Sequence, residues 1–292
     1  MNAGSTGAQR TEGDWSIVIR PEQPWWRLDL KEFWRYRDLL VLLVRRDIVA
    51  QYKQTVLGPL WHVIQPLTTT FTFAFIFGKA AGLSPPDLPP VLFYMSGIVA
   101  WNYFAGVINR TSKTFVGNAN LMSKVYFPRL VVPASMAVSS LVSYLIQLGT
   151  FLLIYGYYYF QGNGGWAPSP WLFALPALVA LMALLGLGSG ILVSSMTTKY
   201  RDLGFLVGFG VQMLMYASPV IMPLERLSRI PWLLTLFKLN PMTPVIEATR
   251  AVFFGYPIDW GGLTYSAGVT VVVMLIGLMT FHRVERSFAD IV

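Results

Sequence analysis

Apolar residues along this chain gather into long stretches, and polar or basic residues lie between them. A helix needs about 20 mostly apolar residues to cross the roughly 30 Å hydrocarbon core of a bilayer, and six stretches are of that order. The pattern therefore predicts an all-α integral membrane protein with six transmembrane helices. The predicted spans cover residues 60–82, 91–109, 131–160, 172–196, 203–223 and 263–282.

Composition strengthens the membrane prediction and removes several other classes. Of the 292 residues, 54% are hydrophobic and 12% are charged, and the mean hydropathy is +0.53, which excludes a soluble domain with a charged surface. The chain has no cysteine and only 2 histidines, so neither a cysteine nucleophile nor a metal site is expected. The net charge of +8 reflects membrane orientation, and no nucleic-acid partner is expected.

Basic residues set the predicted orientation. Nine of the 22 Lys and Arg precede the first span, and eight more fall in the second-to-third loop, the fourth-to-fifth loop and the C-terminal tail. Because cytoplasmic loops carry an excess of Lys and Arg, both termini are expected in the cytoplasm, with the chain in the cytoplasmic (inner) membrane. The polar tail, residues 1–29, contains no apolar core of a signal peptide, so the first span is expected to act as the targeting signal.

Residues 30–57 have the pattern of an amphipathic helix at the cytoplasmic membrane interface. On a straight helix, Arg35, Arg46 and Lys53 return to within about 20° of one another. Apolar residues fall on roughly the opposite side, namely Phe33, Leu40, Val44 and Ile48. Such a helix places basic side chains at anionic headgroups, and membrane anchoring without a substrate role is the alternative interpretation. The Gly-Pro pair at 58–59 then ends the helix and lets the chain turn into the first span.

The connection between the fifth and sixth predicted spans, residues 224–258, is too long and too apolar for a simple loop. It contains two short helical patterns, 225–238 and 244–254, separated by the breaks Asn240-Pro241 and Thr243-Pro244. At about 1.5 Å per residue, neither piece can cross a bilayer. We therefore expect a re-entrant helical hairpin in the outer leaflet, surrounded by protein or water, and a loop lying on the surface is the alternative.

A second cytoplasmic segment, residues 112–126, has amphipathic character and is followed by the break Phe127-Pro128. A short cytoplasmic helix between two spans is the part of a permease that contacts an ATPase. Taken alone, the pattern is equally compatible with a solvated connection between spans.

Four segments resemble the permease subunits of type-two ABC transporters that export O-antigen, capsule or teichoic acid polysaccharides. The segments are RRDIVAQYKQTVLGPLW at 45–61, NANLMSKVYFPRLVVP at 118–133, TTKYRDLGFLVGFGVQMLMYASPVIMP at 197–223 and LNPMTPVIEATRAVFFG at 239–255. They occur in the order and at the spacing of that family.

The resemblance implies a channel-forming permease that moves a lipid-linked polysaccharide, anchored on undecaprenyl pyrophosphate, across the cytoplasmic membrane. It also implies a homodimer among membrane lipids, with two separate ABC nucleotide-binding subunits that bind ATP and Mg. The chain contains no Gly-x-x-x-x-Gly-Lys-Ser/Thr phosphate loop, so it is not expected to be an enzyme by itself or to hold a cofactor.

Together, the patterns and the resemblance assign expected roles to three groups of residues. The substrate headgroup is expected to meet Arg35, Arg46 and Lys53. ATPase coupling is expected of a helix over 112–126, through Lys113, Asn118, Asn120, Leu121 and Lys124. The outer mouth of the channel is expected to be gated by Asn240, Pro241, Thr243 and Pro244.

Aromatic residues in the spans are candidates for a glycan path, because flat rings make broad contacts with the C–H faces of sugars. The candidates are Phe71, Phe75, Trp101, Tyr103, Phe104 and Tyr216. Alternate residues spread around a helix, so the phenylalanines of the first span cannot all face one channel. Lipid contact or helix packing is the alternative role for each aromatic residue.

Two other functions fit parts of the sequence. A drug or small-lipid exporter permease of the same fold would share the span pattern, but the resemblance in 45–61 favours polysaccharide export. A polyprenyl-lipid membrane enzyme would need acidic residues or histidines clustered at one membrane face. Here Asp202 and Glu247 are predicted on opposite sides of the membrane.

Overall fold

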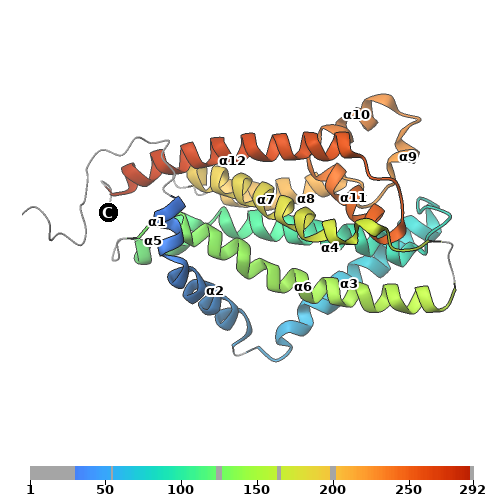
Figure 1. Cartoon of the computed structure of the whole chain (residues 1–292), viewed down its shortest axis with the longest axis horizontal. Helices are drawn as coiled ribbons and strands as arrows, with labels where there is room; N and C mark the ends of the chain where they lie inside the picture. The colour runs from blue at the N-terminus through green and yellow to red at the C-terminus, as the bar shows by residue number, and fades with distance from the viewer. Residues whose placement is uncertain (1–29, 54, 123–126, 163–165, 198–201, 290–292) are drawn as a thin grey trace, which may run out of the picture.

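The computed structural model describes residues 30–53, 55–122, 127–162, 166–197 and 202–289, and within them the chain forms helices and turns without a strand. Most helices run along the long axis of the molecule, with α1, α2 and α5 toward the end where α12 finishes and α9 and α10 at the opposite end (Figure 1). The first six helices are α1 (Leu30–Arg35), α2 (Arg37–Tyr52), α3 (Trp61–Phe73), α4 (Pro90–Thr111), α5 (Thr114–Met122) and α6 (Val131–Phe160). The other six are α7 (Leu175–Thr197), α8 (Leu203–Tyr216), α9 (Leu224–Leu227), α10 (Pro231–Leu239), α11 (Met242–Phe254) and α12 (Trp260–Ala289). A π-helical segment, Ala74–Ala80, continues α3, while 3₁₀ turns at Gly58–Leu60 and Pro170–Ala174 precede α3 and α7.

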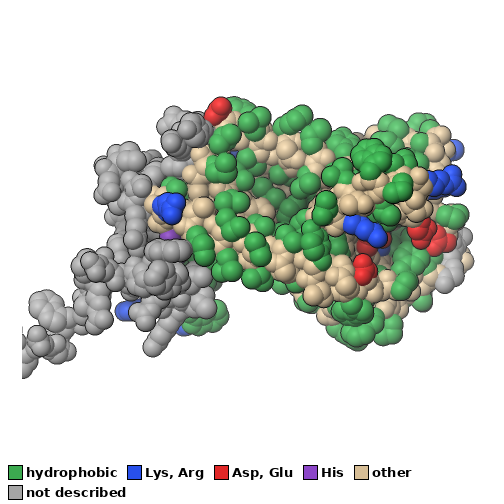
Figure 2. All heavy atoms as spheres, turned by 90° about the horizontal axis from the view of Figure 1, so that it is seen from above, with side chains coloured by type: hydrophobic (Ala, Val, Ile, Leu, Met, Phe, Trp, Pro, Cys, Tyr) green, Lys and Arg blue, Asp and Glu red, His purple; other side chains and the backbone are tan. Residues whose placement is uncertain are grey.

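Five helical stretches in the described part of the chain are long and apolar enough to cross a membrane. They are Gly58–Ala80, Pro90–Thr111, Val131–Phe160, Pro170–Thr197 and Trp260–Val284, and they coincide with five of the six predicted spans. Figure 2 shows one face of the molecule, on which hydrophobic side chains cover the middle and most of the charged side chains lie toward the two ends. This apolar band is the surface that a lipid bilayer requires.

The fifth predicted span, 203–223, is shorter than expected. Its helix α8 has 14 residues, about 21 Å at about 1.5 Å per residue, and turns follow it to residue 222. The early end has a physical reason, because Pro219 lacks the N–H of a helical residue and disfavours the helical conformation at Ser218. The described structure therefore has five long apolar helices and one short one, instead of six equivalent spans.

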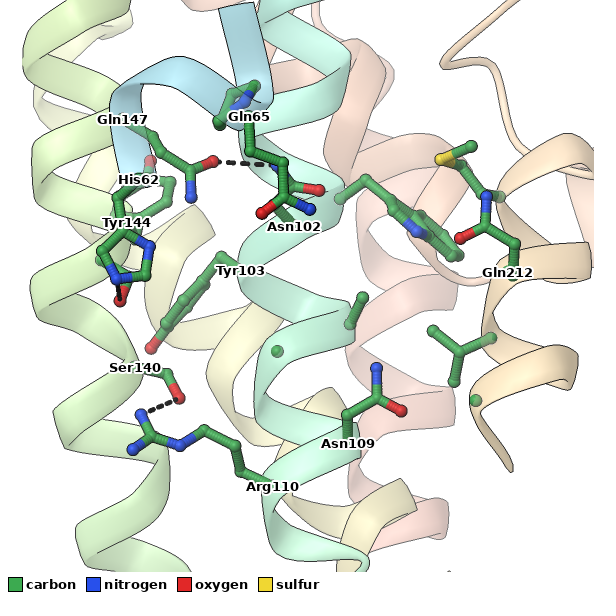
Figure 3. Close-up of a pocket in the computed structure, with 18 of the residues that line it drawn as sticks. His62, Gln65, Asn102, Tyr103, Asn109, Arg110, Ser140, Tyr144, Gln147 and Gln212 are labelled. Atoms are coloured by element: carbon green, nitrogen blue, oxygen red, sulfur yellow. Dashed lines mark hydrogen bonds between the residues drawn. The ribbon is translucent and has the colours of Figure 1, made fainter. Parts of the chain in front are cut away.

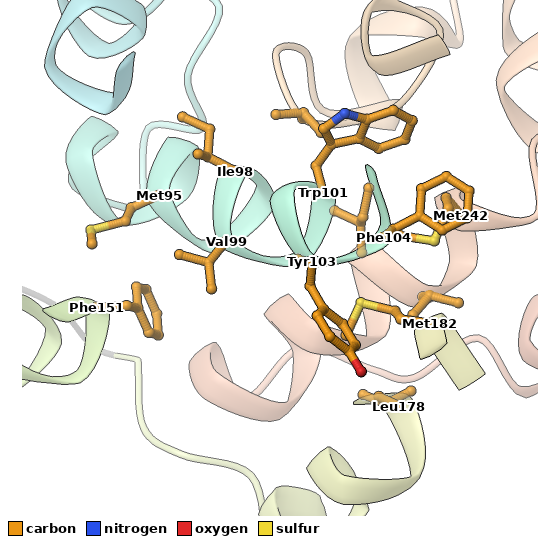
Figure 4. Packing of buried hydrophobic residues seen from close by; sticks show 14 of the residues in the cluster. Met95, Ile98, Val99, Trp101, Tyr103, Phe104, Phe151, Leu178, Met182 and Met242 are labelled. Atoms are coloured by element: carbon orange, nitrogen blue, oxygen red, sulfur yellow. The ribbon is translucent and has the colours of Figure 1, made fainter. Parts of the chain in front are cut away.

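Helix α4 lies at the centre of the bundle. It contacts α3, α6, α7, α8 and α11, and most of its residues are buried. Most of its side chains are apolar, and its Met95, Ile98 and Phe104 belong to the main core (Figure 4). Gly190 lets α7 approach α4 closely, because a Cβ at this position would lie 1.6 Å from Thr111 Oγ1.

A second, smaller core joins α1, α2, α5, α6, α7 and α12 at one end of the bundle. Its buried residues are Leu43, Phe115, Phe127, Val131, Val132, Ile191 and Phe281. The rings of Phe115 and Phe281 stack with centroids 4.6 Å apart, so α5 is attached to the last part of α12.

The helix expected over 30–57 is two helices here, because Tyr36 leaves the helical conformation (φ −93, ψ 20). Arg35 therefore belongs to α1 and Arg46 to α2, while Lys53 follows the end of α2.

Residues 224–258 fold into α9, α10 and α11, so the two predicted helical pieces are present and the first is divided at residues 228–230. The two halves differ in exposure. Helix α11 is almost fully buried and contacts α4, α7 and α12, whereas Trp232 on α10 is 70% exposed.

Arg250 connects α11 to neighbouring parts of the bundle through its side-chain contacts. Its side chain is buried and donates hydrogen bonds to Pro219 O (2.6 Å) and to Glu247 Oε1 (2.9 Å). The guanidinium carbon also lies 3.8 Å from the centroid of the Phe93 ring on α4. A buried cation is stable only when it is paired, and these contacts tie α11 to α4 and to the turn after α8.

Candidate functional site

A polar cavity of about 410 Å³ opens between α3, α4, α6 and α8 (Figure 3). Its lining includes the end of α2, through Gln51, and residues from all four helices. The polar side chains that line it are Gln51, His62, Gln65, Asn102, Asn109, Arg110, Ser140, Ser143, Gln147 and Gln212. No aspartate or glutamate is among the described residues of the lining.

Helical spacing explains why these polar groups meet. Asn102 and Asn109 are seven residues apart on α4, and Ser140, Ser143 and Gln147 are separated by three and four residues on α6, so each set lies on one face of its helix. Polar residues inside membrane helices are costly when they face lipid, and they mark the path of a substrate or ion when they face a shared cavity. The cavity is therefore the first place to look for a function.

Hydrogen bonds hold one wall of the cavity in place. Asn102 Nδ2 donates to Gln147 Oε1 at 3.0 Å, which joins α4 to α6. His62 Nε2 lies 2.8 Å from Gln51 Nε2 and 3.4 Å from Ser143 Oγ, which joins the start of α3 to α2 and α6. The side chains drawn in Figure 3 face a common space, with Gln212 opposite this wall.

Arg110 supplies the positive charge of the cavity. It is partly buried at the last turn of α4, where its guanidinium NH1 donates to Ser140 Oγ at 3.4 Å. That distance is at the long end for a hydrogen bond, so most of the donor capacity of the guanidinium stays available.

The aromatic candidates for a glycan path divide into three groups. Trp101 and Tyr103 line the cavity, and the Tyr103 ring lies 5.0 Å from the ring of Tyr144. Phe104 is buried against Trp101, with centroids 5.3 Å apart, and does not line the cavity. The other three are exposed outside the cavity: Phe71, Phe75 and Tyr216.

All three basic residues predicted to meet a headgroup are exposed, namely Arg35 on α1, Arg46 on α2 and Lys53 after α2. Arg46 also has protein partners. Its guanidinium lies 2.8 Å from Asp47 Oδ1 and donates to Asn118 Oδ1 at 3.4 Å, which connects α2 to α5.

Within the predicted coupling helix over 112–126, the structure has α5, which begins at Thr114 and is kinked at Asn118 (φ −124, ψ 20), and residues 123–126 lie outside the described part. Lys113 precedes it and is exposed, while the side chain of Asn118 is buried and donates to Thr114 O at 3.2 Å. Asn120 and Leu121 belong to α5, but their side chains and Lys124 lie outside the described part of the structure.

The predicted gate residues lie where α10 meets α11, with Asn240 and Pro241 between the two helices and Thr243 and Pro244 in the first turn of α11. Asn240 Nδ2 donates to Ala217 O and to Ser218 Oγ at 3.2 and 3.1 Å, and Asn240 Oδ1 accepts from the Met242 N–H at 3.0 Å. Thr243 Oγ1 donates to Phe237 O at 2.6 Å, and Pro241 O accepts from Ser266 Oγ on α12 at 2.8 Å. The turn, with Pro244 also buried, is therefore anchored to the end of α8 and to α12.

A further contact closes the same end of the bundle. The hydroxyl of Tyr256, after α11, donates to Asp87 in the loop before α4. Burial, together with this hydrogen bond, raises the pKa of the Tyr256 hydroxyl above its usual value.

The prediction from sequence missed most of the cavity lining. The missed residues are Gln51, His62, Gln65, Asn102, Asn109, Arg110, Ser140, Ser143, Gln147 and Gln212. A usable signal was present, because Asn102 and Asn109 recur at helical spacing inside the second predicted span and Gln147 lies inside the third, where amides are rare. The direction in which each face points depends on packing, which the sequence pattern does not contain.

The match to known proteins extends over most of the chain. The model of the family described as ABC-2 type transporter matches residues 38–254. The O-antigen export system permease protein RfbA of Klebsiella pneumoniae is 25% identical over 259 residues, which are 87% of this chain and 95% of that protein. The protein of the same name from Myxococcus xanthus is 25% identical over 262 residues, 89% and 98% of the two chains. The polysialic acid transport protein KpsM of Escherichia coli is 24% identical over 246 residues, 84% and 93% of the two chains.

Proposed function

The chain belongs to the ABC-2 type transporter family, and we propose that it is the permease subunit of an ATP-driven exporter of a lipid-linked polysaccharide. Relatives named for O-antigen export and polysialic acid transport support a polysaccharide as the cargo, since the similarity covers at least 84% of this chain. The observation that carries the proposal is the polar cavity between four helices, because amide and guanidinium groups facing one another inside apolar helices suit a hydrophilic cargo.

The proposed topology has six spans. The fifth consists of α8 and the turns that continue it to residue 222, and both termini lie in the cytoplasm. The basic N-terminal region and the loop between α4 and α6 then fall on the cytoplasmic side, in agreement with the excess of Lys and Arg there. Helices α9 to α11 form a re-entrant hairpin on the outer side, and the burial of α11 supports this arrangement, because backbone at membrane depth must be covered by protein or water.

The proposed active assembly contains two copies of the chain and two ATPase subunits, which bind ATP and Mg. Helix α5 is the docking element for the ATPase. Its support is its position: the stacked rings of Phe115 and Phe281 and the contact between Asn118 and Arg46 connect it to α12 and α2. A displacement of α5 would therefore reach both the last span and the interface helix.

Substrate enters along the interface helices. Exposed Arg35 and Lys53 attract the undecaprenyl-pyrophosphate headgroup, since a basic side chain at a membrane surface contributes about 1 kcal/mol toward anionic lipid. Arg46 is also exposed and shares this role, and in addition it contacts Asn118 on α5. The glycan then follows the cavity past Trp101 and Tyr103, while exposed Phe71, Phe75 and Tyr216 face the second copy or lipid.

The outer turn at Asn240, Pro241, Thr243 and Pro244 closes the path between cycles. Its hydrogen bonds to the end of α8 support this role, because α8 also lines the cavity. A movement of α8 that widens the cavity would therefore pull on the turn.

Deletion of the gene tests the proposed function. Cells without the permease are expected to lose the surface polysaccharide and to accumulate its lipid-linked form on the cytoplasmic leaflet, and the wild-type chain should restore export. Normal surface polysaccharide with accumulation of a drug or a small lipid would contradict the proposal and favour a different exporter.

A further inference from the structure

The charge of the cavity has one sign. Arg110 reaches the lining, no acidic side chain is found among the described residues there, and the long hydrogen bond to Ser140 leaves other guanidinium N–H groups free to bind. A guanidinium in a partly enclosed site binds carboxylate or phosphate oxygens through charge-assisted hydrogen bonds, which are stronger than neutral ones. The cavity therefore favours an anion and disfavours a metal cation.

The same cavity has a second chemical character. Amide and hydroxyl side chains supply donors and acceptors together, in the hydrogen-bonded pair Asn102–Gln147 and in Gln65, Asn109 and Gln212. A hydroxyl group both donates and accepts, so this mixture suits a polyhydroxylated ligand.

Aromatic faces and size complete the description. Trp101 and Tyr103 belong to the lining, and the small exposed parts of their side chains, 2% and 5%, add apolar surface beside the amides. The volume of about 410 Å³ lies within the range of about 300–1,000 Å³ that is usual for small-molecule sites. The cavity is large enough for one or two sugar units.

We propose that this cavity is a binding subsite for a sugar that carries a negative charge, with Arg110 binding the anion and the Asn102–Gln147 pair binding the hydroxyls. The inference rests on the proposed function, because it names the part of the cargo that the cavity selects. The anion is a phosphate ester or a carboxylate. It belongs either to the lipid-linked end of the substrate or to an acidic sugar within the glycan.

Ligand binding to the intact permease in lipid nanodiscs tests this subsite. Titrations followed by saturation-transfer NMR would use glucose 1-phosphate, glucuronate and glucose as probes. The wild type is expected to bind both anionic sugars at least about tenfold more tightly than glucose, the size expected for a hydrogen bond to a charged group. Undecaprenyl phosphate is then added as a competitor. If undecaprenyl phosphate competes with the sugars, the anion belongs to the lipid-linked end of the substrate. If it does not compete, the anion belongs to a sugar of the glycan. Both results are compatible with the subsite.

Three variants separate the contributions. Arg110→Gln should remove the preference, so that anionic sugars and glucose bind with similar affinity, and Arg110→Lys should keep most of the preference. Gln147→Met should weaken the binding of all three sugars by a similar factor. Arg229→Gln is the control, because it removes the same charge at an exposed residue outside the cavity. This variant should bind the three sugars as the wild type does.

Equal binding of glucose and glucose 1-phosphate by the wild type would overturn the subsite. An unchanged preference in Arg110→Gln would overturn it as well. Either failure is distinguishable from failure of the proposed function, because the deletion experiment measures export without reference to Arg110. A chain that restores export and binds the three sugars equally would refute the subsite alone.

Discussion

The buried guanidinium of Arg250 makes a prediction at the scale of one residue. Arg250→Met removes the donor for Pro219 O and breaks the ion pair with Glu247. A buried acceptor without a partner costs about 1–3 kcal/mol, so the variant should unfold at a clearly lower temperature in detergent. Arg229→Met is the control, because Arg229 is exposed. Equal unfolding temperatures of Arg250→Met and the wild type would show that the contacts of Arg250 contribute nothing to stability.

The hydroxyl of Tyr256 predicts a dependence on pH. Its pKa is raised in the folded protein, so the contribution of the contact with Asp87 is complete below the unfolded value of about 10 and is lost as the pH rises toward the folded value. The unfolding temperature should therefore fall above pH ~10. Tyr256→Phe should show a smaller fall over the same interval. Identical alkaline profiles of the two proteins would exclude this contribution.

Single residues also show what the sequence could predict of the site. Trp101, Tyr103 and Phe104 were all candidates for a glycan path, and that role stays a prediction. Trp101 and Tyr103 belong to the cavity lining, whereas Phe104, three residues after Trp101, does not. Residue type indicates chemistry, but the direction of each side chain depends on which neighbouring helix it meets. The amides of the cavity were recognisable as polar groups in apolar spans, yet only the packing of α4 against α6 brings Asn102 to Gln147.

At the scale of elements, the contact between α2 and α5 predicts coupling between two helices. Arg46→Ala or Asn118→Ala should each reduce the stimulation of ATPase activity by lipid-linked glycan, and the double variant should be no worse than the single ones, because both remove the same contact. Arg45 is adjacent and exposed, so Arg45→Ala is the matched control. Additive losses in the double variant would show that the two residues act independently.

The outer hairpin predicts a pattern of chemical labelling. A cysteine at Trp232, which is 70% exposed on α10, should react with a membrane-impermeant thiol reagent added from outside. A cysteine at Asn240, which is 6% exposed, should react slowly at rest and faster during ATP turnover if the turn opens. The chain has no native cysteine to react in their place. Labelling of position 232 only from the cytoplasmic side would contradict the proposed topology.

Elements were easier to predict than their lengths. Long apolar stretches such as 131–160 coincide with single helices, because about 20 apolar residues in a row have few other stable arrangements in a membrane. The break at Tyr36 and the early end of α8 were not expected. No proline or glycine near Tyr36 signals a break in the sequence. Pro219 does signal one, but it lies within a run of apolar residues that had the length of a full span.

At the scale of the whole molecule, the cavity, α5 and the outer turn lie along one route through the bundle. The cavity is lined by α4, whose last turn leads to α5, and by α8, whose end is bonded to the turn at Asn240. In the proposed assembly with ATPase subunits, contacts of this kind would connect motion at one end of the bundle to the other end. The match to the ABC-2 type transporter family agrees with such an arrangement. The proposed cargo rests on the chemistry of the cavity and on the similarity to named polysaccharide exporters.

Translocation in a reconstituted system tests the central claim most directly. The permease and its ATPase would be placed in proteoliposomes with a lipid-linked glycan, and an enzyme that cleaves the glycan would be confined to the side opposite the ATPase. The account predicts cleavage that requires ATP, Mg and the permease, and that is lost with a hydrolysis-deficient ATPase. Equal cleavage without the permease, or no cleavage during active ATP hydrolysis by the intact assembly, would contradict it.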